Sequence, residues 1–476
     1  MVRPAACLAL LALACAPVAA RRGNTVILAS GADLQSPNPL ITTHPLARQV
    51  QRYALLVTLV RYDSLLAPAP YLARRWRWSA DSTVLTFSIF TGLTWHDGTP
   101  TTAHDAAWTL TAAVAPETGY PRRSDLASLL EARAPDDSTL VLRFSRALPG
   151  MPDVLTDLAV VPRHLLDTVP LARLRQAGWN RRPVGNGPFR FVAHQPNRRW
   201  VFAANRGFPE ELGGPPRLDR FVVVVVDEPT TKLAALTSGE LDFAGINPAH
   251  AEFVRKDPRL RVLDYPLLLT YAMIFNLRSP PFDRIEARRS VAAALDPRAV
   301  VEGVLFGFGT PASGPLPPEL VAPAAPESPG RARPEPGGAG SLRFELLTVG
   351  SGEAPLEQML QAQLAARGTR AEIRQLELST FLDRVQGPAR EFQAAVMGVS
   401  GDLGLGHLVP LARTAGLRPD LTGERLVSLI QDSVAAVFLY HARGVQGMNR
   451  RVNGVTMDLR GELVTLSQWW VDDGAR

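Results

Sequence analysis

Residues 95–110, WHDGTPTTAHDAAWTL, form the stretch of sequence that predicts most about the fold. The pair Asp97-Gly98 is typical of a tight turn. Thr102, followed three residues later by Asp105, is typical of a helix N-terminus. The hydroxyl accepts a hydrogen bond from a free backbone N–H, and the carboxylate stabilises the positive end of the helix. The stretch therefore predicts a turn followed by a capped helix.

Histidines in and beyond this stretch invite a metal interpretation. His96 and His104 each precede an aspartate, but the turn and the helix cap already account for both pairs. His407 and His441 have no metal-ligand spacing. The sequence accordingly predicts no metal site and no cofactor.

Strand and helix patterns surround this stretch. Residues 84–90 alternate like a half-buried strand, and Asp81-Ser82 supplies a turn that connects them to residues 71–78. The apolar run 221–226 is typical of a buried strand. Helical spacing occurs at residues 46–59, 285–295 and 357–367. These patterns predict both strands and helices along the chain.

Length and composition narrow the class of protein. The chain has 476 residues, which suggests about three structural units. Hydrophobic residues make up 46% and charged residues 20%, so the chain can bury a sizeable core. The net charge of +6 would suit a nucleic-acid partner, but the arginine pairs are scattered along the chain and form no patch. We therefore expect no nucleic-acid binding.

The N-terminus has the pattern of an export signal. Arg3 precedes the apolar residues 5–14, a stretch too short to cross a bilayer as a helix. Two processing routes stay open: cleavage of a signal peptide after Ala20, or lipidation of Cys15 within a lipoprotein-like box. Both predict a periplasmic or extracytoplasmic body that meets a membrane only if Cys15 carries a lipid anchor.

Motifs that would carry catalysis are missing from the sequence. Cys7 and Cys15 are its two cysteines, so the body of the chain can hold neither a disulfide nor a catalytic thiol. It contains no H-E-x-x-H, G-x-S-x-G or P-loop pattern. We expect a protein that is not an enzyme.

Four segments, in this order, carry a resemblance to a known family. They are residues 71–105, with Trp95-His96-Asp97-Gly98-Thr99-Pro100; 184–189, Val-Gly-Asn-Gly-Pro-Phe; 227–242, with Asp227-Glu228-Pro229-Thr230 and Gly239-Glu240-Leu241-Asp242; and 275–296, with Phe275-Asn276-Leu277. Together they resemble the extracellular solute-binding proteins of family 5, the oligopeptide-, dipeptide- and nickel-binding group served by ABC importers. The resemblance extends from Val26 to the C-terminus.

The resemblance implies an α/β fold, namely a two-lobe, periplasmic-binding-protein-like fold of type II (cluster C), with an extra subdomain in lobe I. The implied division is 24–263 for lobe I, with the subdomain at about 55–180; 264–435 for lobe II, with a Pro-rich segment at 310–341; and 436–476 for the return to lobe I. Crossover strands near Asp264 and Ala435 would form a hinge, and closure about it would enclose a ligand.

The resemblance also suggests ligand-binding residues. Asp402 matches the carboxylate that grips the ligand's α-ammonium group in peptide-binding members, and a fixed anion in a closed cleft binds a cation strongly. The other candidates are Tyr271, Asn276, His44 and Arg390, the last as a partner for a ligand carboxylate. Each also has a structural alternative, such as packing within lobe II for Tyr271 or solvent exposure for Arg390.

Two departures from the family pattern leave two functions open. Val399 stands where peptide binders carry a Trp, and the segment from Gly404 to Asp432 is shorter than in most relatives. The first hypothesis is a monomeric substrate-binding component that captures a peptide or similar small solute and delivers it to an ABC permease in the inner membrane. The alternative is a sensor or scaffold derived from the same family, with a trimmed lobe II and no transport.

Overall fold

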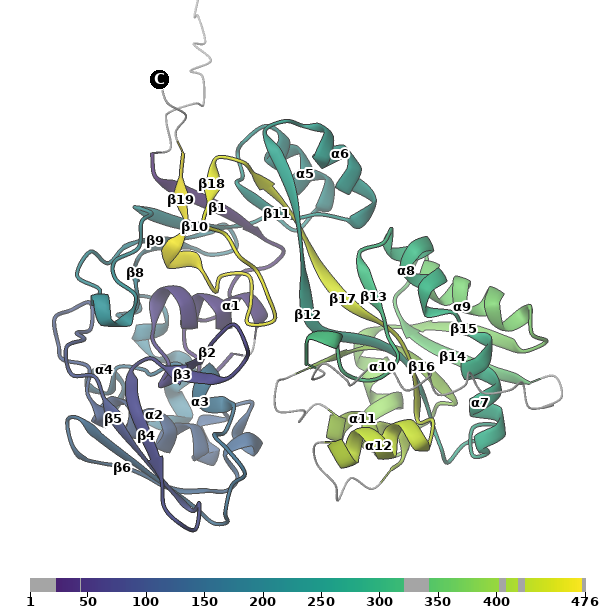
Figure 1. Cartoon of the computed structure of the whole chain (residues 1–476), viewed down its shortest axis with the longest axis horizontal. Coiled ribbons are helices and arrows are strands. Elements are labelled where there is room, and N and C mark those ends of the chain that lie inside the picture. The colour runs from purple at the N-terminus through teal and green to yellow at the C-terminus, as the bar shows by residue number, and fades with distance from the viewer. Residues whose placement is uncertain (1–22, 43, 321–341, 402–407, 418–423, 473–476) are drawn as a thin grey trace, which may run out of the picture.

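Two long strands connect the two lobes of the protein (Figure 1). The computed structural model describes residues 23–42, 44–320, 342–401, 408–417 and 424–472. Strands β12 (Leu260–Phe275) and β17 (Ala436–Asn449) are antiparallel and pair along almost their whole length. We call lobe I the part that contains β1 to β11, β18 and β19, and lobe II the part that contains α7 to α12. Asp264 lies within β12, and Ala435 directly precedes β17.

One 11-stranded sheet extends through both lobes. Besides β12 and β17 its strands are β1 (Thr25–Ser30), β8 (Phe189–Gln195), β9 (Arg199–Ala204), β10 (Arg220–Val225), β11 (Phe243–Gly245), β13 (Gly309–Pro311), β14 (Arg343–Val349), β15 (Arg370–Leu376) and β16 (Ala394–Ser400). Their order is β15-β14-β16-β12-β17-β11-β1-β10-β9-β8, with β13 beside β17. β1 is parallel to β10, and β14 is parallel to both β15 and β16. The buried strand predicted at 221–226 is confirmed as β10.

Helices cover both faces of the sheet in lobe II. They are α7 (Ile285–Ala294), α8 (Pro297–Leu305), α9 (Pro355–Ala365), α10 (Leu378–Gln386), α11 (Leu408–Ala415) and α12 (Glu424–Asp432). Side chains alternate along β12 because successive residues of a strand point to opposite faces. Met273 and Phe275 thus share a core with α7, α8 and α9, whereas Ala272 and Ile274 share one with α11 and α12.

A smaller antiparallel sheet lies within lobe I. Its strands, β4 (Ala73–Trp78), β5 (Val84–Ile89), β6 (Leu129–Asp136) and β7 (Thr139–Phe144), follow the order β4-β5-β7-β6. Helix α2 (Ala103–Val114) begins at Thr102, whose hydroxyl accepts from the backbone N–H of His104 at 3.3 Å. The Asp105 carboxylate accepts from the Thr102 N–H at 2.9 Å. The predicted capped helix and the 71–90 hairpin are both confirmed.

The helix predicted at residues 46–59 is wrong beyond Leu55. Helix α1 (Pro45–Val50) continues as a π-helical turn, η1 (Gln51–Leu55), and the chain is then extended. The backbone N–H groups of Asn186 and Gly187 donate to the Leu55 carbonyl oxygen at 3.1 and 2.9 Å, and the Asn186 amide oxygen accepts from the Val57 N–H at 3.1 Å. These bonds use the groups that a longer helix would need, so the helix ends.

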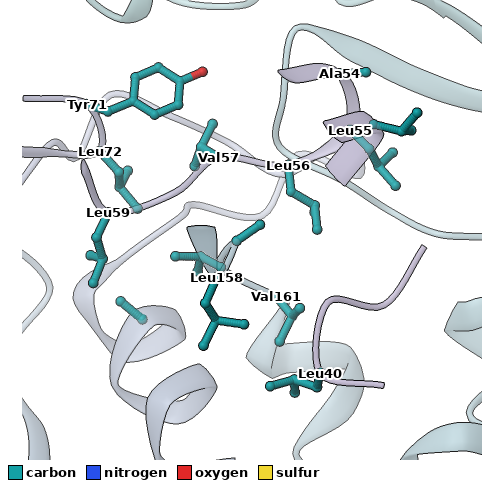
Figure 2. Packing of buried hydrophobic residues seen from close by; sticks show 14 of the residues in the cluster. Leu40, Ala54, Leu55, Leu56, Val57, Leu59, Tyr71, Leu72, Leu158 and Val161 are labelled. Carbon is teal, nitrogen blue, oxygen red and sulfur yellow. The ribbon is translucent and has the colours of Figure 1, made fainter. Parts of the chain in front are cut away.

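The extended segment after η1 belongs to the core of lobe I. Figure 2 shows side chains of Leu56, Val57 and Leu59 converging with Leu72, Leu158 and Val161. This packing holds the segment that follows α1 and η1 in place. Lobe I contains two further helices, α5 (Pro229–Thr237) and α6 (Ala251–Lys256), and two short helices, α3 (Val154–Asp157) and α4 (Arg163–Leu166). In the described ranges, every helix is too short or too polar to cross a lipid bilayer.

Candidate ligand-binding cavity

A cavity of about 770 Å³ lies between the lobes. Its size falls within the range of roughly 300–1,000 Å³ that is usual for small-molecule sites. Lobe I supplies most of the wall, from α1, η1, the β2–β3 hairpin (Val60–Tyr62 and Pro68–Pro70), α3 and the loop that follows β18 (Val452–Asn453). Lobe II contributes residues 266–268 of β12 and Ser400-Gly401 at the end of β16.

Three arginines surround one aspartate in the lobe I wall, and we call Arg48, Arg52 and Arg122 the arginine cluster. The carboxylate of Asp157, the last residue of α3, accepts hydrogen bonds from Arg48 and Arg122 and forms an ion pair with Arg52. Arg48 Nη2 and Arg122 Nη1 lie 2.5 and 2.7 Å from Asp157 Oδ2, and Arg52 Nη1 lies 2.9 Å from Oδ1. Arg48 and Arg52 are four residues apart on α1 and η1, so they project from one face.

Burial makes this cluster electrostatically strong. The Asp157 side chain is only 9% exposed. Burial alone would raise the pKa of Asp157, but the three guanidinium groups outweigh it and hold that pKa below its usual value. Burial raises the pKa of Tyr53 and of Tyr120. The Tyr53 hydroxyl donates to the Arg460 carbonyl oxygen at 2.9 Å.

The C-terminal part of the chain forms a second charged side of the cavity. Arg460 and Asp458, both in the wall, form an ion pair at 2.6 Å. Glu462 accepts from the Tyr265 hydroxyl at 2.7 Å, and burial raises the pKa of the Glu462 carboxyl group. Tyr265 lies on β12 and packs against Gly444 of β17, where a Cβ would lie 2.1 Å from the ring. The cavity wall is thus attached to both crossover strands.

The β2–β3 hairpin closes the remaining side. Asp63 stabilises its turn, because one carboxylate oxygen accepts from the N–H groups of Leu65 and Ala67 at 2.8 and 2.9 Å. The Arg61 guanidinium lies 5.1 Å from the centre of the Tyr71 ring, and burial raises the pKa of Tyr71 to about 12. In the described ranges Arg61 has no ion-pair partner. Nowhere in those ranges do three His, Cys, Asp or Glu side chains gather in a way that could hold a metal ion.

The sequence profile of the bacterial extracellular solute-binding proteins, family 5, matches residues 67–407. The chain belongs to this family. Membership places it among solute-binding proteins and not among enzymes.

Individual family 5 relatives are distant in sequence. A putative ABC transporter peptide-binding protein of Brucella ovis is 28% identical over 58% of this chain and 51% of the relative. The di/tripeptide-binding protein 2 of Pseudomonas aeruginosa is 27% identical over 70% of this chain and 68% of that protein. The matched region thus spans about half the length of the first of these curated relatives.

A solved structure confirms the fold. The oligopeptide-binding protein AppA from Bacillus subtilis, in complex with a nonapeptide, superposes with a TM-score of 0.75 at 20% identity. The match covers 95% of this chain and 99% of AppA. The expected two-lobe fold of cluster C is therefore confirmed.

The segments that resemble family 5 prove to hold the structure together. A Cβ at Gly185 would lie 2.0 Å from the Leu55 carbonyl oxygen, and one at Gly187 would lie 2.4 Å from that of Ala54. These glycines let the 184–189 loop meet the end of η1 and so fix Arg52. The His96 ring contacts the Gly187 carbonyl oxygen at 3.0 Å, and burial lowers the pKa of His96 to about 4.

The four described candidates from the sequence lie outside the cavity wall. His44 caps α1, accepting from the Ala47 N–H at 3.3 Å, and directly precedes Pro45 of the wall. Tyr271 stacks on Tyr440 within lobe II, with ring centres 4.8 Å apart. Asn276 donates to the carbonyl oxygens of Arg390 and Phe392, both at 2.9 Å.

Asn276 and Arg390 border a separate hollow at the other end of the β12–β16 pair. The pairing begins at Leu269 beside Ser400 and ends at Phe275 beside Ala394, so the length of the strands separates this hollow from the cavity. Asp402, His407, Cys15 and Ala20, and most of the Pro-rich segment, lie outside the described residues. Their predicted roles stay predictions.

The arginine cluster is the feature that sequence reasoning missed. The sequence signal that could have found it is the four-residue spacing of Arg48 and Arg52, which places both side chains on one face of a helix. Of the 51 basic residues only Lys232 and Lys256 are lysines, so arginines at helical spacing are common in this chain and single out nothing. Asp157 is more than a hundred residues from Arg48, and no local pattern connects them.

Proposed function

We propose that the protein captures a peptide or similar small solute in the cavity, closes about β12 and β17, and delivers the ligand to a membrane permease of the ABC type. The observation that carries this proposal is the cavity itself, whose wall comes from two lobes connected by two strands. Binding proteins of such architecture close by bending at a few residues of the connecting segments.

The division of the wall supports capture by closure. Lobe I offers charged side chains, whereas lobe II offers the aliphatic Leu267 and Leu268 and the small residues Ser400 and Gly401. When such a lobe covers a bound solute it excludes water, and polar contacts on the opposite wall become stronger as the local dielectric falls. Relatives named as peptide-binding proteins support a peptide as the solute.

A thermal-shift measurement tests the proposal. The mature protein is heated with dipeptides to pentapeptides, with single amino acids and with nickel–histidine. A peptide at about 100 times its Kd should stabilise the protein by about 2.7 kcal/mol, which raises Tm by several degrees. The variant Arg143→Gln is the control, because Arg143 is exposed on β7 outside the cavity and should respond like wild type. No shift with any peptide would contradict peptide capture.

The second candidate function is a ligand sensor or scaffold without transport. The observation that favours it is the small share of lobe II among the described residues of the wall, together with the trimming of lobe II that the sequence predicts between Gly404 and Asp432. Transport assays with a reconstituted permease from the same genome separate the two candidates. Ligand binding without stimulated uptake favours the sensor, and uptake that depends on the protein favours import.

A further inference from the structure

Within the described residues, the arginine cluster has three guanidinium groups and only two carboxylate partners. Arg122 has two carboxylate partners, Asp157 and Asp125. For Arg48 and Arg52 the described carboxylate partner is Asp157, which all three arginines share. The side chains of Arg48 and Arg52 are 31% and 18% exposed, so water screens them only in part. A partly buried cation with no partner of its own is costly, so a further anion would be stabilising here.

Hydrogen bonding leads to the same conclusion. A guanidinium group has five N–H donors in a planar fork that matches a carboxylate. Arg48 donates to Asp157, and Arg52 adds only a long bond of 3.4 Å to the Arg460 carbonyl oxygen. The Nε atoms of Arg48 and Arg52 are buried with no acceptor in the described structure. Both side chains therefore keep an N–H donor without an acceptor among the described residues.

The cluster is also held in place before any ligand arrives. Asp157 pairs with all three guanidinium groups, and η1 is fixed by Gly185 and Gly187. Side chains that are already oriented lose little entropy on binding. Among the described residues, the lobe II wall consists of residues 266–268 and 400–401, none of which is charged.

We propose that Arg48, Arg52 and Arg122 bind a carboxylate group of the ligand, which in a peptide is its C-terminal carboxylate. Asp157 acts as a positioning residue that orients the arginines. This inference rests on the proposed function, because it assigns one end of the captured solute to one wall of the same cavity.

Isothermal titration calorimetry with matched peptides tests the inference. Dialanine, trialanine and pentaalanine are compared with their C-terminal amides on wild type, Arg52→Gln and Arg143→Gln. On wild type the free acids should bind at least about 30-fold more tightly than the amides, because the amide leaves buried charge unpaired. Arg52→Gln should weaken the acids by a similar factor and bind acids and amides alike, whereas Arg143→Gln should match wild type.

Several results would overturn the inference. Equal affinity of wild type for acids and amides is one, and unchanged acid binding by a folded Arg52→Gln is another. If Arg52→Gln fails to fold, Arg48→Lys replaces it, since lysine keeps the charge but loses the fork. Arg48→Lys should bind the acids between about 3- and 30-fold more weakly, and no change would contradict the inference.

Titrations with other anions distinguish a protein that binds no peptide from one whose arginine cluster binds no anion. If no peptide binds wild type, citrate and inorganic phosphate are titrated instead. An anion that binds wild type but not Arg52→Gln supports the cluster as a carboxylate-type site and rejects peptides as the solute. If neither peptides nor these anions bind wild type, both proposals fail.

Discussion

The two lobes build the walls of the same cavity in opposite ways. Lobe I presents ion pairs and hydroxyl groups fixed by other side chains, such as the arginine cluster around Asp157 and the pair Arg460–Asp458. Lobe II presents aliphatic side chains and backbone, with the Gly401 N–H donating to the Leu268 carbonyl oxygen at 2.6 Å. The difference suggests that lobe I selects the ligand's charge, while lobe II covers the ligand and removes water.

The most severe way to break the lobe I wall is to remove the anion at its centre. Asp157→Ala leaves three arginines partly buried without their shared partner, and we expect a loss of roughly 3–5 kcal/mol in the free energy of unfolding. Asp125→Ala is the matched control, because its pair with Arg122 is more exposed and should contribute less than about 1 kcal/mol. Urea denaturation measures both, and equal effects would contradict the central role of Asp157.

Asp402 tests whether lobe II also contributes a charged group to ligand binding. It follows the lobe II wall residue Gly401 in sequence. If Asp402 binds the α-ammonium group of a peptide, Asp402→Ala should weaken binding of peptides with a free N-terminus by roughly 2–4 kcal/mol. N-acetylated peptides, which lack that charge, should bind wild type and variant alike. Calorimetry that gives equal affinities for the free peptides would refute this role and leave lobe II without a charged contact.

The contact between the 184–189 loop and η1, which carries Arg52, can be disturbed without changing any charge. Gly185→Ala places a methyl group against the Leu55 carbonyl oxygen, so the loop and η1 must separate, and we expect a loss of about 1–3 kcal/mol in stability. Gly178→Ala is the control, since nothing lies within 4 Å of a Cβ there. Thermal denaturation compares the two, and the same Tm for both variants would mean that the contact at Gly185 is not required.

Lowering the pH should reduce the stability of the protein, because each lobe contains a buried histidine. Burial lowers the pKa of His96 in lobe I and of His441 beside Thr270 in lobe II to about 4, so both are neutral in the folded state at neutral pH. The unfolded chain binds these protons near pH 6.5, so stability falls as the pH decreases from 6.5 towards 4. Each histidine should cost about 1.4 kcal/mol per pH unit in that window.

Urea denaturation at pH 7.5 and 5.5 measures this loss. His96→Gln and His441→Gln should each flatten the dependence by about half if the two lobes contribute equally. A stability that does not change between these two pH values would contradict the expected burial of both rings.

Local sequence patterns predicted elements whose stabilising contacts are themselves local. The capped helix at Thr102 follows from two side chains within one turn, and the 71–90 hairpin follows from alternation and a turn, so both could be found without tertiary information. The end of the helix after Leu55 could not, because the groups that end it belong to residues 186 and 187. The positions of the candidates Asn276 and Arg390 could not be predicted from local patterns either. Only strand pairing places them at the end of β12 and β16 that lies away from the cavity.

The sequence by itself determined the family, through the segments that resemble family 5, and that resemblance implied the two-lobe α/β architecture. It also determined most of the elements, because these depend on periodicity and capping residues that act over a few positions. Only the tertiary structure decided where charge gathers. Arg48, Arg122 and Asp157 come from three separate segments, and a charge becomes strong only when folding removes water from around it. Neither their proximity nor their burial is encoded in any local pattern, so the charged wall of the cavity became visible only in the folded chain.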